Sequence, residues 1–270
     1  MRKAVMDIGT NTFNLLIADV TDRSFKILYS TREAVLLGMG GINDNRITDD
    51  AMSRALLTIE KFAQICDSFN IDRMNVVAIG TSALRGATNS PKFLDIVKRE
   101  FAIGIKIISG EDEANLIFQG VKWTHDFEKS AVIMDIGGGS SEFIHANSSG
   151  IQNLLSLEIG VSRVYQLFDH PETYSKELQA SILSYFDKCP NNQMHQFSSD
   201  ILIGASGSFE TFYEMIFQSK WKSDNKVVEL PLQDLMRELE WAVNSKQSER
   251  DNHVWITEIR KKCSQSRHYK

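Results

Sequence analysis

Two short stretches of the chain combine glycine, hydroxyl and carboxylate residues in a pattern suited to binding phosphate. Met6–Gly9 (MDIG) recurs as Met134–Gly137, each time after apolar residues and before small or hydroxyl residues. A strand that ends in glycine and doubles back exposes a row of backbone N–H groups, and such a row binds anions. We interpret both stretches as phosphate-binding turns, in which Asp7 and Asp135 could hold Mg²⁺ beside the phosphate oxygens.

Hydroxyl side chains follow both turns and could donate further hydrogen bonds to phosphate: Thr10, Thr12, Ser140 and Ser141. The alternative is two ordinary hairpins in which the aspartates have turn roles. A third glycine loop, at residues 203–208, contains Gly207. It is either another phosphate contact or the start of a helix capped by Ser206 or Ser208.

Two glutamates are candidates for activating water. Glu113 lies in the acidic stretch Ser109–Glu113, where it could act as a general base. The same stretch also fits a capping box, with Ser109 as the N-cap and Asp112 closing the box at the positive end of a helix. Glu142, just after the second glycine turn, is an acid in an otherwise apolar strand, which makes it a second candidate for the base or for metal binding.

Two arginines could contact a bound phosphate. Arg85 lies about one turn into a helix that follows a strand, from which its guanidinium could reach phosphate with two hydrogen bonds. Alternatively, the Arg85 side chain faces solvent. The same two alternatives, a phosphate contact or a solvent-facing side chain, hold for Arg163, just past Gly160.

The elements that must position these residues alternate between strand and helix periods. In the first half we expect strands at 4–8, 13–20, 25–30, 34–37, 74–79 and 103–108, and helices at 48–69 (N-cap Thr48), 91–101 and 109–121. In the second half we expect strands at 130–136, 142–146, 154–159 and 200–203, a helix after Gly160 and one at 232–243 with Pro231 at its first position. Because strand, glycine turn and strand recur in order, the sequence predicts an internal duplication. The polar, basic stretch after Asn244 is expected to be poorly ordered.

Composition narrows the class of protein. The 270 residues carry a net charge of −5, which argues against non-specific binding of nucleic acid. No apolar run approaches the ~18 residues needed to span a bilayer, and no signal peptide is visible. The three cysteines lie far apart and indicate free thiols in a reducing compartment. We therefore expect a cytoplasmic protein that makes no contact with membranes.

Five stretches of the chain resemble the exopolyphosphatase/guanosine-pentaphosphate phosphatase (Ppx/GppA) family, in the order found there: MDIGTNTFNLLIADV, AIGTSALRGATN, IISGEDEANLIFQGV, VIMDIGGGSSEFI and ILIGASGSFETF. The resemblance runs from about residue 3 to about residue 215. It implies an α/β protein of two duplicated RNase H-like domains with the architecture of actin-like ATPases and a cleft between the domains. We place these domains at 1–122 and 123–270.

The resemblance also implies roles for single residues. Gly9, Thr10, Asn11 and Thr12 would form the first phosphate loop, and Asp135, Gly137, Gly138, Gly139 and Ser140 the second. Glu113 would be the catalytic base, Glu142 would help to place water and metal, and Arg85 would contact phosphate. The implied reaction is hydrolysis of a terminal phosphoanhydride bond of inorganic polyphosphate, or of guanosine pentaphosphate, by an in-line water with Mg²⁺.

The sequence departs from the family near Glu249-Arg250, after which the family continues with further elements of the second domain. A shortened second domain would expose apolar surface, which favours a homodimer or aggregation. It motivates one alternative, a sensor that binds polyphosphate or an alarmone nucleotide with little turnover. A kinase or ATPase of the same fold is the other alternative, disfavoured because Glu113 and Glu142 suit water activation.

Overall fold

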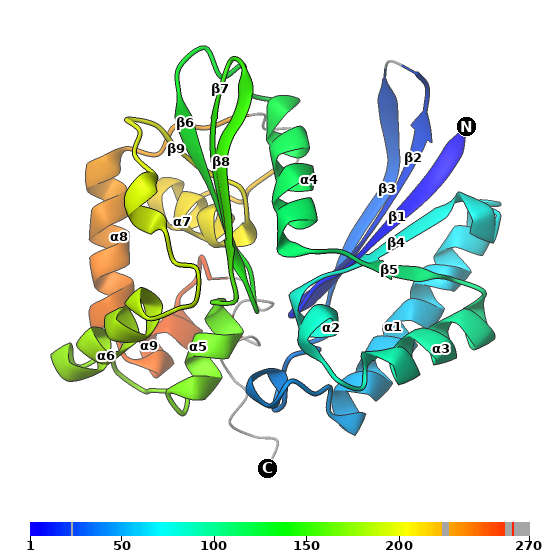
Figure 1. Cartoon of the computed structure of the whole chain (residues 1–270), viewed down its shortest axis with the longest axis horizontal. Helices are drawn as coiled ribbons and strands as arrows, with labels where there is room; N and C mark the ends of the chain where they lie inside the picture. The colour runs from blue at the N-terminus through cyan, green and yellow to red at the C-terminus, as the bar shows by residue number, and fades with distance from the viewer. Residues whose placement is uncertain (23, 223–226, 257–260, 262–270) are drawn as a thin grey trace. The chain divides into compact units, whose positions relative to one another are not determined.

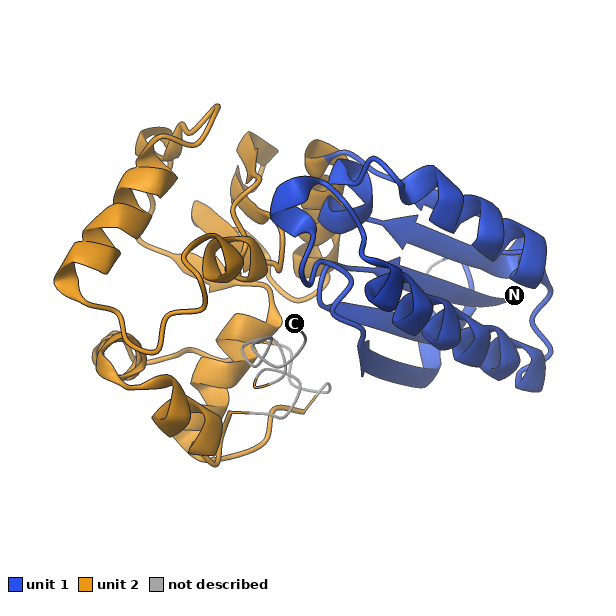
Figure 2. Cartoon of the chain, turned by 90° about the horizontal axis from the view of Figure 1, so that it is seen from below, with its two compact units in different colours: residues 1–109 blue, residues 110–270 orange. Residues whose placement is uncertain are grey.

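The computed structural model describes residues 1–22, 24–222, 227–256 and 261. The chain forms two compact units, Met1–Ser109 and Gly110–Lys270, which Figure 2 shows in separate colours. Each unit is built on its own β-sheet.

The first unit contains a five-stranded sheet in the order β3-β2-β1-β4-β5 (Figure 1). Its strands are β1 (Arg2–Ile8), β2 (Thr12–Val20), β3 (Phe25–Ala34), β4 (Val76–Gly80) and β5 (Ile105–Ile107). The first three are antiparallel neighbours, whereas β4 pairs with β1, and β5 with β4, in parallel. Because β1 and β4 are parallel, their carboxyl ends lie at the same edge of the sheet. The first glycine turn, which follows β1, therefore lies beside the start of the short helix that follows β4.

Helices cover the face of this sheet that carries the alternating apolar residues of β1 and β2. They are α1 (Asp49–Ser68), the short α2 (Ser82–Gly86) and α3 (Ser90–Phe101). The expected cap is confirmed, because the Thr48 side chain accepts a hydrogen bond from the N–H of Ala51 at 3.2 Å. Fully buried Phe13, Phe62 and Phe93 join the sheet and helices in one core.

The second unit repeats this order with the sheet β8-β7-β6-β9. Its strands are β6 (Ala131–Ile136), β7 (Ser141–Asn147), β8 (Gly150–Leu157) and β9 (Leu202–Gly204). Its helices are α4 (Gly110–Lys122), α5 (Val161–Leu167), α6 (Lys176–Asp187), α7 (Gly207–Phe217), α8 (Leu232–Asn244) and α9 (Gln247–Asn252). Again β6 is antiparallel to β7 and parallel to β9, so the predicted duplication is present in the strand pairing.

Apolar side chains line both faces of the second sheet. Ala114 and Phe118 of α4 pack with Ile133, Ile144 and their neighbours on one face. Phe143, Leu155 and Leu157 form a second cluster on the other face, against residues of the α5–α6 region. Helix α4 thus covers the sheet face that also carries the odd-numbered residues of β6, including Asp135.

The division between the units lies one helix before the boundary expected at 122/123. Helix α4 packs on β7 and β8, because its apolar residues Ala114 and Phe118 face that sheet. It consequently belongs to the second compact unit.

Several elements differ from the sequence-based expectation. Strand β3 runs unbroken to Ala34, and the expected strand at 34–37 is wrong because Leu36 adopts a positive φ of 54°. Residues 73–75 form a 3₁₀ turn before β4, and Pro231 is the N-cap of α8 rather than its first residue. Helix α6 has no counterpart among the expected elements.

The stretch after Asn244, for which the sequence predicts poor order, contains α9. The N–H of Gln247 donates to the carbonyl of Glu172 at 2.8 Å, and the Arg250 guanidinium donates to the carbonyl of Ala242 at 3.2 Å. Polar contacts therefore replace the apolar face that the sequence lacks. Residues 257–260 and 262–270 of that stretch lie outside the described residues.

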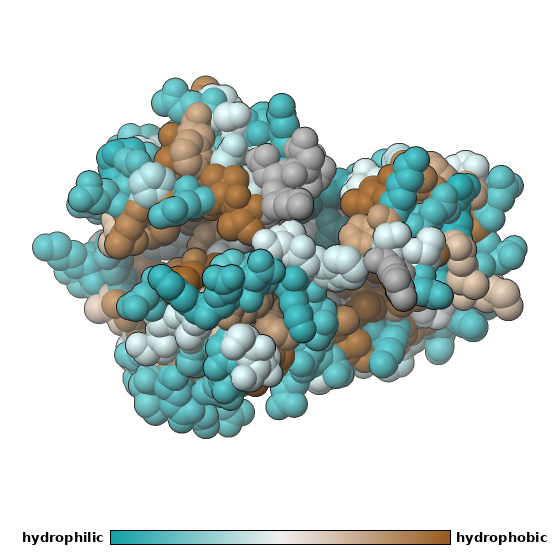
Figure 3. Space-filling model, turned by 90° about the horizontal axis from the view of Figure 1, so that it is seen from above, coloured by the Kyte–Doolittle hydropathy of each residue, from teal (hydrophilic) through white to brown (hydrophobic). Residues whose placement is uncertain are grey.

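Large exposed apolar side chains occur in both units, for example Ile27, Trp123, Leu183 and Leu232. Figure 3 shows brown apolar patches among the teal hydrophilic side chains on the face it presents. In the part of the chain that the structure describes, no helix has the length and apolar character needed to cross a membrane.

Candidate functional site

The second glycine turn joins β6 to β7 and is closed by a hydrogen bond from the N–H of Gly137 to the carbonyl of Ser140, at 3.0 Å. A Cβ atom on Gly137 would lie 2.9 Å from that carbonyl oxygen, so a side chain does not fit here without a shift of the backbone. Glycine is required at 137 because the two arms of the turn approach so closely.

The start of α5 binds the carbonyl side of this turn. The N–H of Val161 donates to the carbonyl of Gly137 at 3.0 Å, and that of Ser162 to the carbonyl of Gly138 at 2.9 Å. The Arg163 guanidinium donates to the carbonyl of Gly139 at 3.1 Å. Three successive carbonyl groups of the turn are therefore directed toward α5.

The N–H groups of the same peptides are directed the opposite way. In a trans peptide the C=O and N–H bonds are antiparallel, so the N–H groups of Gly138, Gly139 and Ser140 point away from α5. Among the described residues no acceptor takes a hydrogen bond from these three N–H groups. Such a row of backbone donors fits the predicted anion site.

Beside the turn, a row of polar side chains crosses three strands. Asp135 of β6 is opposite Glu142 of β7, which is opposite Ser156 of β8. The Ser156 hydroxyl donates to the Glu142 carboxyl at 2.9 Å, and Glu142 is only 1% exposed. Glu113, in the first turn of α4, is close enough to Glu142 to affect its ionisation. The structure thus brings together Glu113, Asp135 and Glu142, and adds Ser156.

The pKa of Glu142 is raised to about 8. Burial is the main cause, because it disfavours the charged carboxylate, and the negative charge of Glu113 adds to it. Hydrogen bonds from Ser156 and Ser140 oppose the shift, while the charge of Asp135 adds to it. A buried acid with a strongly perturbed pKa next to other acids is typical of a functional site.

The first glycine turn has the same construction, built from other residues. The N–H of Gly9 donates to the carbonyl of Thr12 at 3.1 Å, and a Cβ atom on Gly9 would lie 2.8 Å from that oxygen. The carbonyl of Thr10 accepts from Gly38 at 3.1 Å, and that of Asn11 from Val35 at 2.9 Å.

The polar row beside the first turn has a different charge. Asp7 is opposite Asn14, which is opposite Arg32. The Asn14 amide donates to Asp7 at 3.0 Å, and Arg32 donates to Asn14 at 3.1 Å. Since one carboxylate faces one guanidinium across an amide, this row is nearly neutral, whereas the equivalent row of the second unit is acidic.

The other predicted site residues occupy varied places. Arg85, in α2, donates to the carbonyl of Ile108 at 3.1 Å. The Ser141 hydroxyl is buried and donates to the carbonyl of Ile159 at 2.6 Å, and is thus bound within the protein.

Gly207 is the first residue of α7, whose N-cap is Ser206, and the Ser206 hydroxyl bonds the backbone of Ile136 in β6. The third glycine loop is therefore attached to the strand that leads into the second turn.

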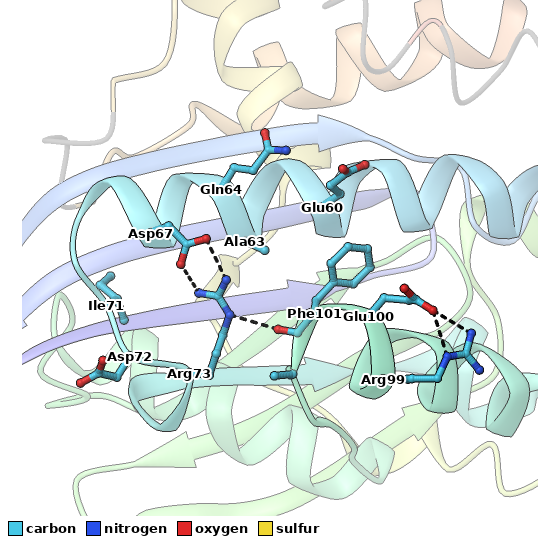
Figure 4. A pocket seen from close by; sticks show the side chains of 11 residues that line it. Glu60, Ala63, Gln64, Asp67, Ile71, Asp72, Arg73, Arg99, Glu100 and Phe101 are labelled. Carbon is cyan, nitrogen blue, oxygen red and sulfur yellow. Dashed lines mark hydrogen bonds and ion pairs between the residues drawn. The ribbon is translucent and has the colours of Figure 1, made fainter.

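A surface groove of about 610 Å³ lies between α1 and α3 of the first unit (Figure 4). Its two arginines already have acidic partners. Arg73 pairs with Asp67 at 2.7 Å, and Arg99 pairs with Glu100 at 2.9 Å. The groove also lies at the C-terminal end of α1, which is next to the start of β1, whereas the glycine turn follows the end of that strand. It is consequently a poorer phosphate site than the turns.

The acidic row of the second unit fits a divalent cation. Within the described residues no three His, Cys, Asp or Glu side chains form a ready-made metal cluster. Mg²⁺ rarely uses such a cage, because it binds through one or two carboxylates together with phosphate oxygens and water. A cation between Asp135 and Glu142 would also offset the repulsion that raises the pKa of Glu142.

Comparison with known proteins shows which family this chain resembles. The model of the Ppx/GppA phosphatase family matches residues 16–253. The chain is similar to the bifunctional 3-dehydroquinate synthase/phosphatase of Fusobacterium nucleatum, with 37% identity over 174 residues. That match covers 62% of this chain and 26% of the relative, so the chain spans about a quarter of that protein's length.

Solved structures resemble nearly the whole chain. An exopolyphosphatase from Cytophaga hutchinsonii has 35% identity and a TM-score of 0.89, with 98% of this chain and 87% of that chain covered. A Ppx/GppA enzyme from Aquifex aeolicus has a TM-score of 0.77 at 22% identity, with 98% and 89% covered, and at that identity the likeness concerns the fold alone. The expected fold class, the two-domain α/β fold of actin-like ATPases, is thereby confirmed.

Proposed function

Because the chain belongs to the Ppx/GppA phosphatase family, we propose that it is a phosphoanhydride hydrolase that releases the terminal phosphate of inorganic polyphosphate. One observation carries the proposal: half-buried Asp135 and buried Glu142 form an acidic row beside a turn in which the N–H groups of Gly138, Gly139 and Ser140 have no acceptor among the described residues. The 35% identity to a structure described as an exopolyphosphatase supports polyphosphate as the substrate. Guanosine pentaphosphate, which also carries a terminal phosphoanhydride, is the second substrate to test.

The residues of the second unit divide the chemistry among them. The N–H groups of Gly138, Gly139 and Ser140 would donate to the terminal phosphoryl group and stabilise its developing charge. Glu113 would orient the attacking water and accept its proton. Glu142, held by Ser156, would place that water on the line of attack, since most of the acceleration in phosphoryl transfer comes from positioning and charge stabilisation.

Asp135 and Glu142 are the residues that would hold Mg²⁺ beside the phosphate. When bound, the ion would neutralise charge on the phosphoryl oxygens. Asp7 is the equivalent carboxylate of the first unit and is a further candidate ligand. Its hydrogen bond from Asn14 and its nearby Arg32 make it the weaker candidate.

The first unit would contribute binding rather than acid-base chemistry. Its turn has the same backbone construction, but its polar row has neither a buried glutamate nor a second carboxylate. We therefore propose that Gly9, Thr10, Asn11 and Thr12, together with Arg85, form a phosphate-binding site of the first unit. Hydrolysis would depend on the acids of the second unit.

The proposal is tested by incubating the purified chain with polyphosphate or guanosine pentaphosphate and Mg²⁺ and measuring released phosphate. Replacing Glu113→Gln removes the base and is expected to lower kcat by about 10²–10⁴-fold. The control is Glu111→Gln, an exposed acid in the same first turn of α4, which should leave the rate unchanged. EDTA in place of Mg²⁺ should stop release. If Glu113→Gln released phosphate as fast as wild type, the assignment of the base would be wrong.

A further inference from the structure

Arg163 has contacts that differ from those expected of a phosphate ligand. Its Nε donates to the carbonyl of Gly139 at 3.1 Å, and its Nη2 pairs with the Glu158 carboxylate at 3.0 Å. The side chain is 11% exposed. The guanidinium therefore lies on the side of the glycine turn to which the backbone carbonyls point. The backbone N–H groups of Gly138, Gly139 and Ser140 point to the opposite side.

We propose that Arg163 is a positioning residue for the turn at residues 137–140. By holding the Gly139 carbonyl toward α5, it fixes the peptide that links Gly139 to Ser140, and so directs the Ser140 N–H toward the substrate. This inference rests on the proposed function of the turn as a phosphate site. In this role Arg163 aligns the Ser140 N–H but does not itself contact the substrate.

The first unit supplies an internal reference for this role. There the equivalent carbonyl, that of Asn11, accepts two backbone N–H groups, from Val35 at 2.9 Å and Leu36 at 2.8 Å. In the second unit, among the described residues, no backbone N–H donates to the Gly139 carbonyl. The Arg163 side chain takes the place of those backbone donors.

The backbone of the second unit cannot supply the missing donor, because α5 already starts as close as it can. A Cβ atom on Gly160 would lie 2.4 Å from the carbonyl of Gly138, so the chain enters α5 in direct contact with the turn. The N–H groups of Val161, Ser162 and Arg163 are used on the carbonyls of Gly137 and Gly138. Only a side chain that reaches back along the helix can bind the third carbonyl.

The charge of Arg163 is matched locally by Glu158, so the role needs a hydrogen-bond donor more than a positive charge. A positioning role and a direct phosphate contact therefore give opposite results for matched variants. Arg163→Gln keeps an N–H donor without charge, whereas Arg163→Met keeps the length of the side chain without a donor. Arg237→Met removes an exposed guanidinium of α8 and serves as the control.

The first measurement is steady-state release of phosphate from polyphosphate. Loss of an aligned donor is expected to lower kcat of Arg163→Met by about 10–100-fold with little change in KM, and that of Arg163→Gln by only about threefold. Glu158→Gln, which loosens the guanidinium, should also lower kcat. If Arg163 instead bound phosphate, Arg163→Gln and Arg163→Met would raise KM by the same factor. Glu158→Gln would then lower KM, because it removes a negative charge near the substrate. That pattern would overturn the inference.

The second measurement does not depend on activity. Amide hydrogen exchange in the whole 270-residue chain should accelerate at Gly137, Val161 and Ser162 in Arg163→Met, and should stay near wild type in Arg163→Gln and Arg237→Met. Unchanged exchange in Arg163→Met would contradict the positioning role. A wild type that releases no phosphate would contradict the proposed function, while the exchange data would still decide the role of Arg163.

Discussion

At the scale of single residues, Glu142 gives the second unit a contribution to stability that depends on pH. Its carboxyl is buried between two other acids, and its pKa rises from an ordinary 4.5 to about 8. The folded state therefore binds a proton more tightly than the unfolded state. The contribution of Glu142 to stability therefore falls as pH rises from about 4.5 to about 8 and is constant outside that window.

Replacing Glu142→Gln removes this titration while keeping an oxygen that can accept from Ser156. The variant is expected to be more stable than wild type above pH 8, on the order of a few kcal/mol, and the difference should shrink toward pH 5. Urea unfolding of both proteins at several pH values measures it. A difference that is the same at pH 5 and pH 9 would mean that Glu142 is not the titrating group.

At the scale of elements, the glycine turns depend on the absence of a Cβ atom, whereas the helix position Gly120 does not. Gly137→Ala places Cβ 2.9 Å from the carbonyl oxygen of Ser140, so the turn must shift, at a cost of about 1–3 kcal/mol. At Gly120, on the exposed side of α4, a Cβ atom would have no neighbour within 4 Å. There alanine should stabilise the protein by about 0.5–1 kcal/mol.

Thermal unfolding of the two variants compares them within one unit of the protein. The Tm should fall for Gly137→Ala and rise for Gly120→Ala. Equal effects of the two changes would show that close approach at the turn is not what requires glycine at 137.

The strand-and-turn part of the site can be predicted from the sequence, because its residues are contiguous. The repeated MDIG shows where each strand ends, and alternation then places Asp135 and Glu142 on one face. Ser156 escapes such reasoning because it comes from a third strand, and the pairing of β7 with β8 contains an irregularity after His145 that sequence periodicity does not show. A hydroxyl among the apolar residues of β8 is the available signal.

Arg163 shows a different limit of sequence reasoning. Its position after Gly160 indicates a helix start, which the structure confirms, but not whether the guanidinium faces ligand or protein. The choice depends on the close approach of Gly160 to the turn, which is a tertiary contact. Likewise α9 depends on hydrogen bonds to the distant Glu172, so its polar sequence alone gives no sign of order.

At the scale of the whole molecule, a chain of net charge −5 is proposed to bind a polyanion. Long-range attraction cannot supply the affinity, since the overall field repels phosphate. The affinity must come from short-range donors, chiefly the N–H groups of the glycine turns, and from Mg²⁺. Binding should therefore respond more strongly to changes in the turn than to changes in surface charge.

This expectation can be separated from catalysis by measuring stabilisation by ligand. In Glu113→Gln, which should bind with much slower turnover, inorganic triphosphate with Mg²⁺ is expected to raise the Tm, because a ligand present at about 100 times its Kd adds about 2.7 kcal/mol to stability. Adding Gly137→Ala to that variant should remove most of the shift, since the realigned N–H groups no longer converge on phosphate. Adding Arg237→Met, a change of surface charge on α8, should leave the shift intact. A shift that survived Gly137→Ala but disappeared with Arg237→Met would mean that surface charge, and not the glycine turn, holds the polyanion.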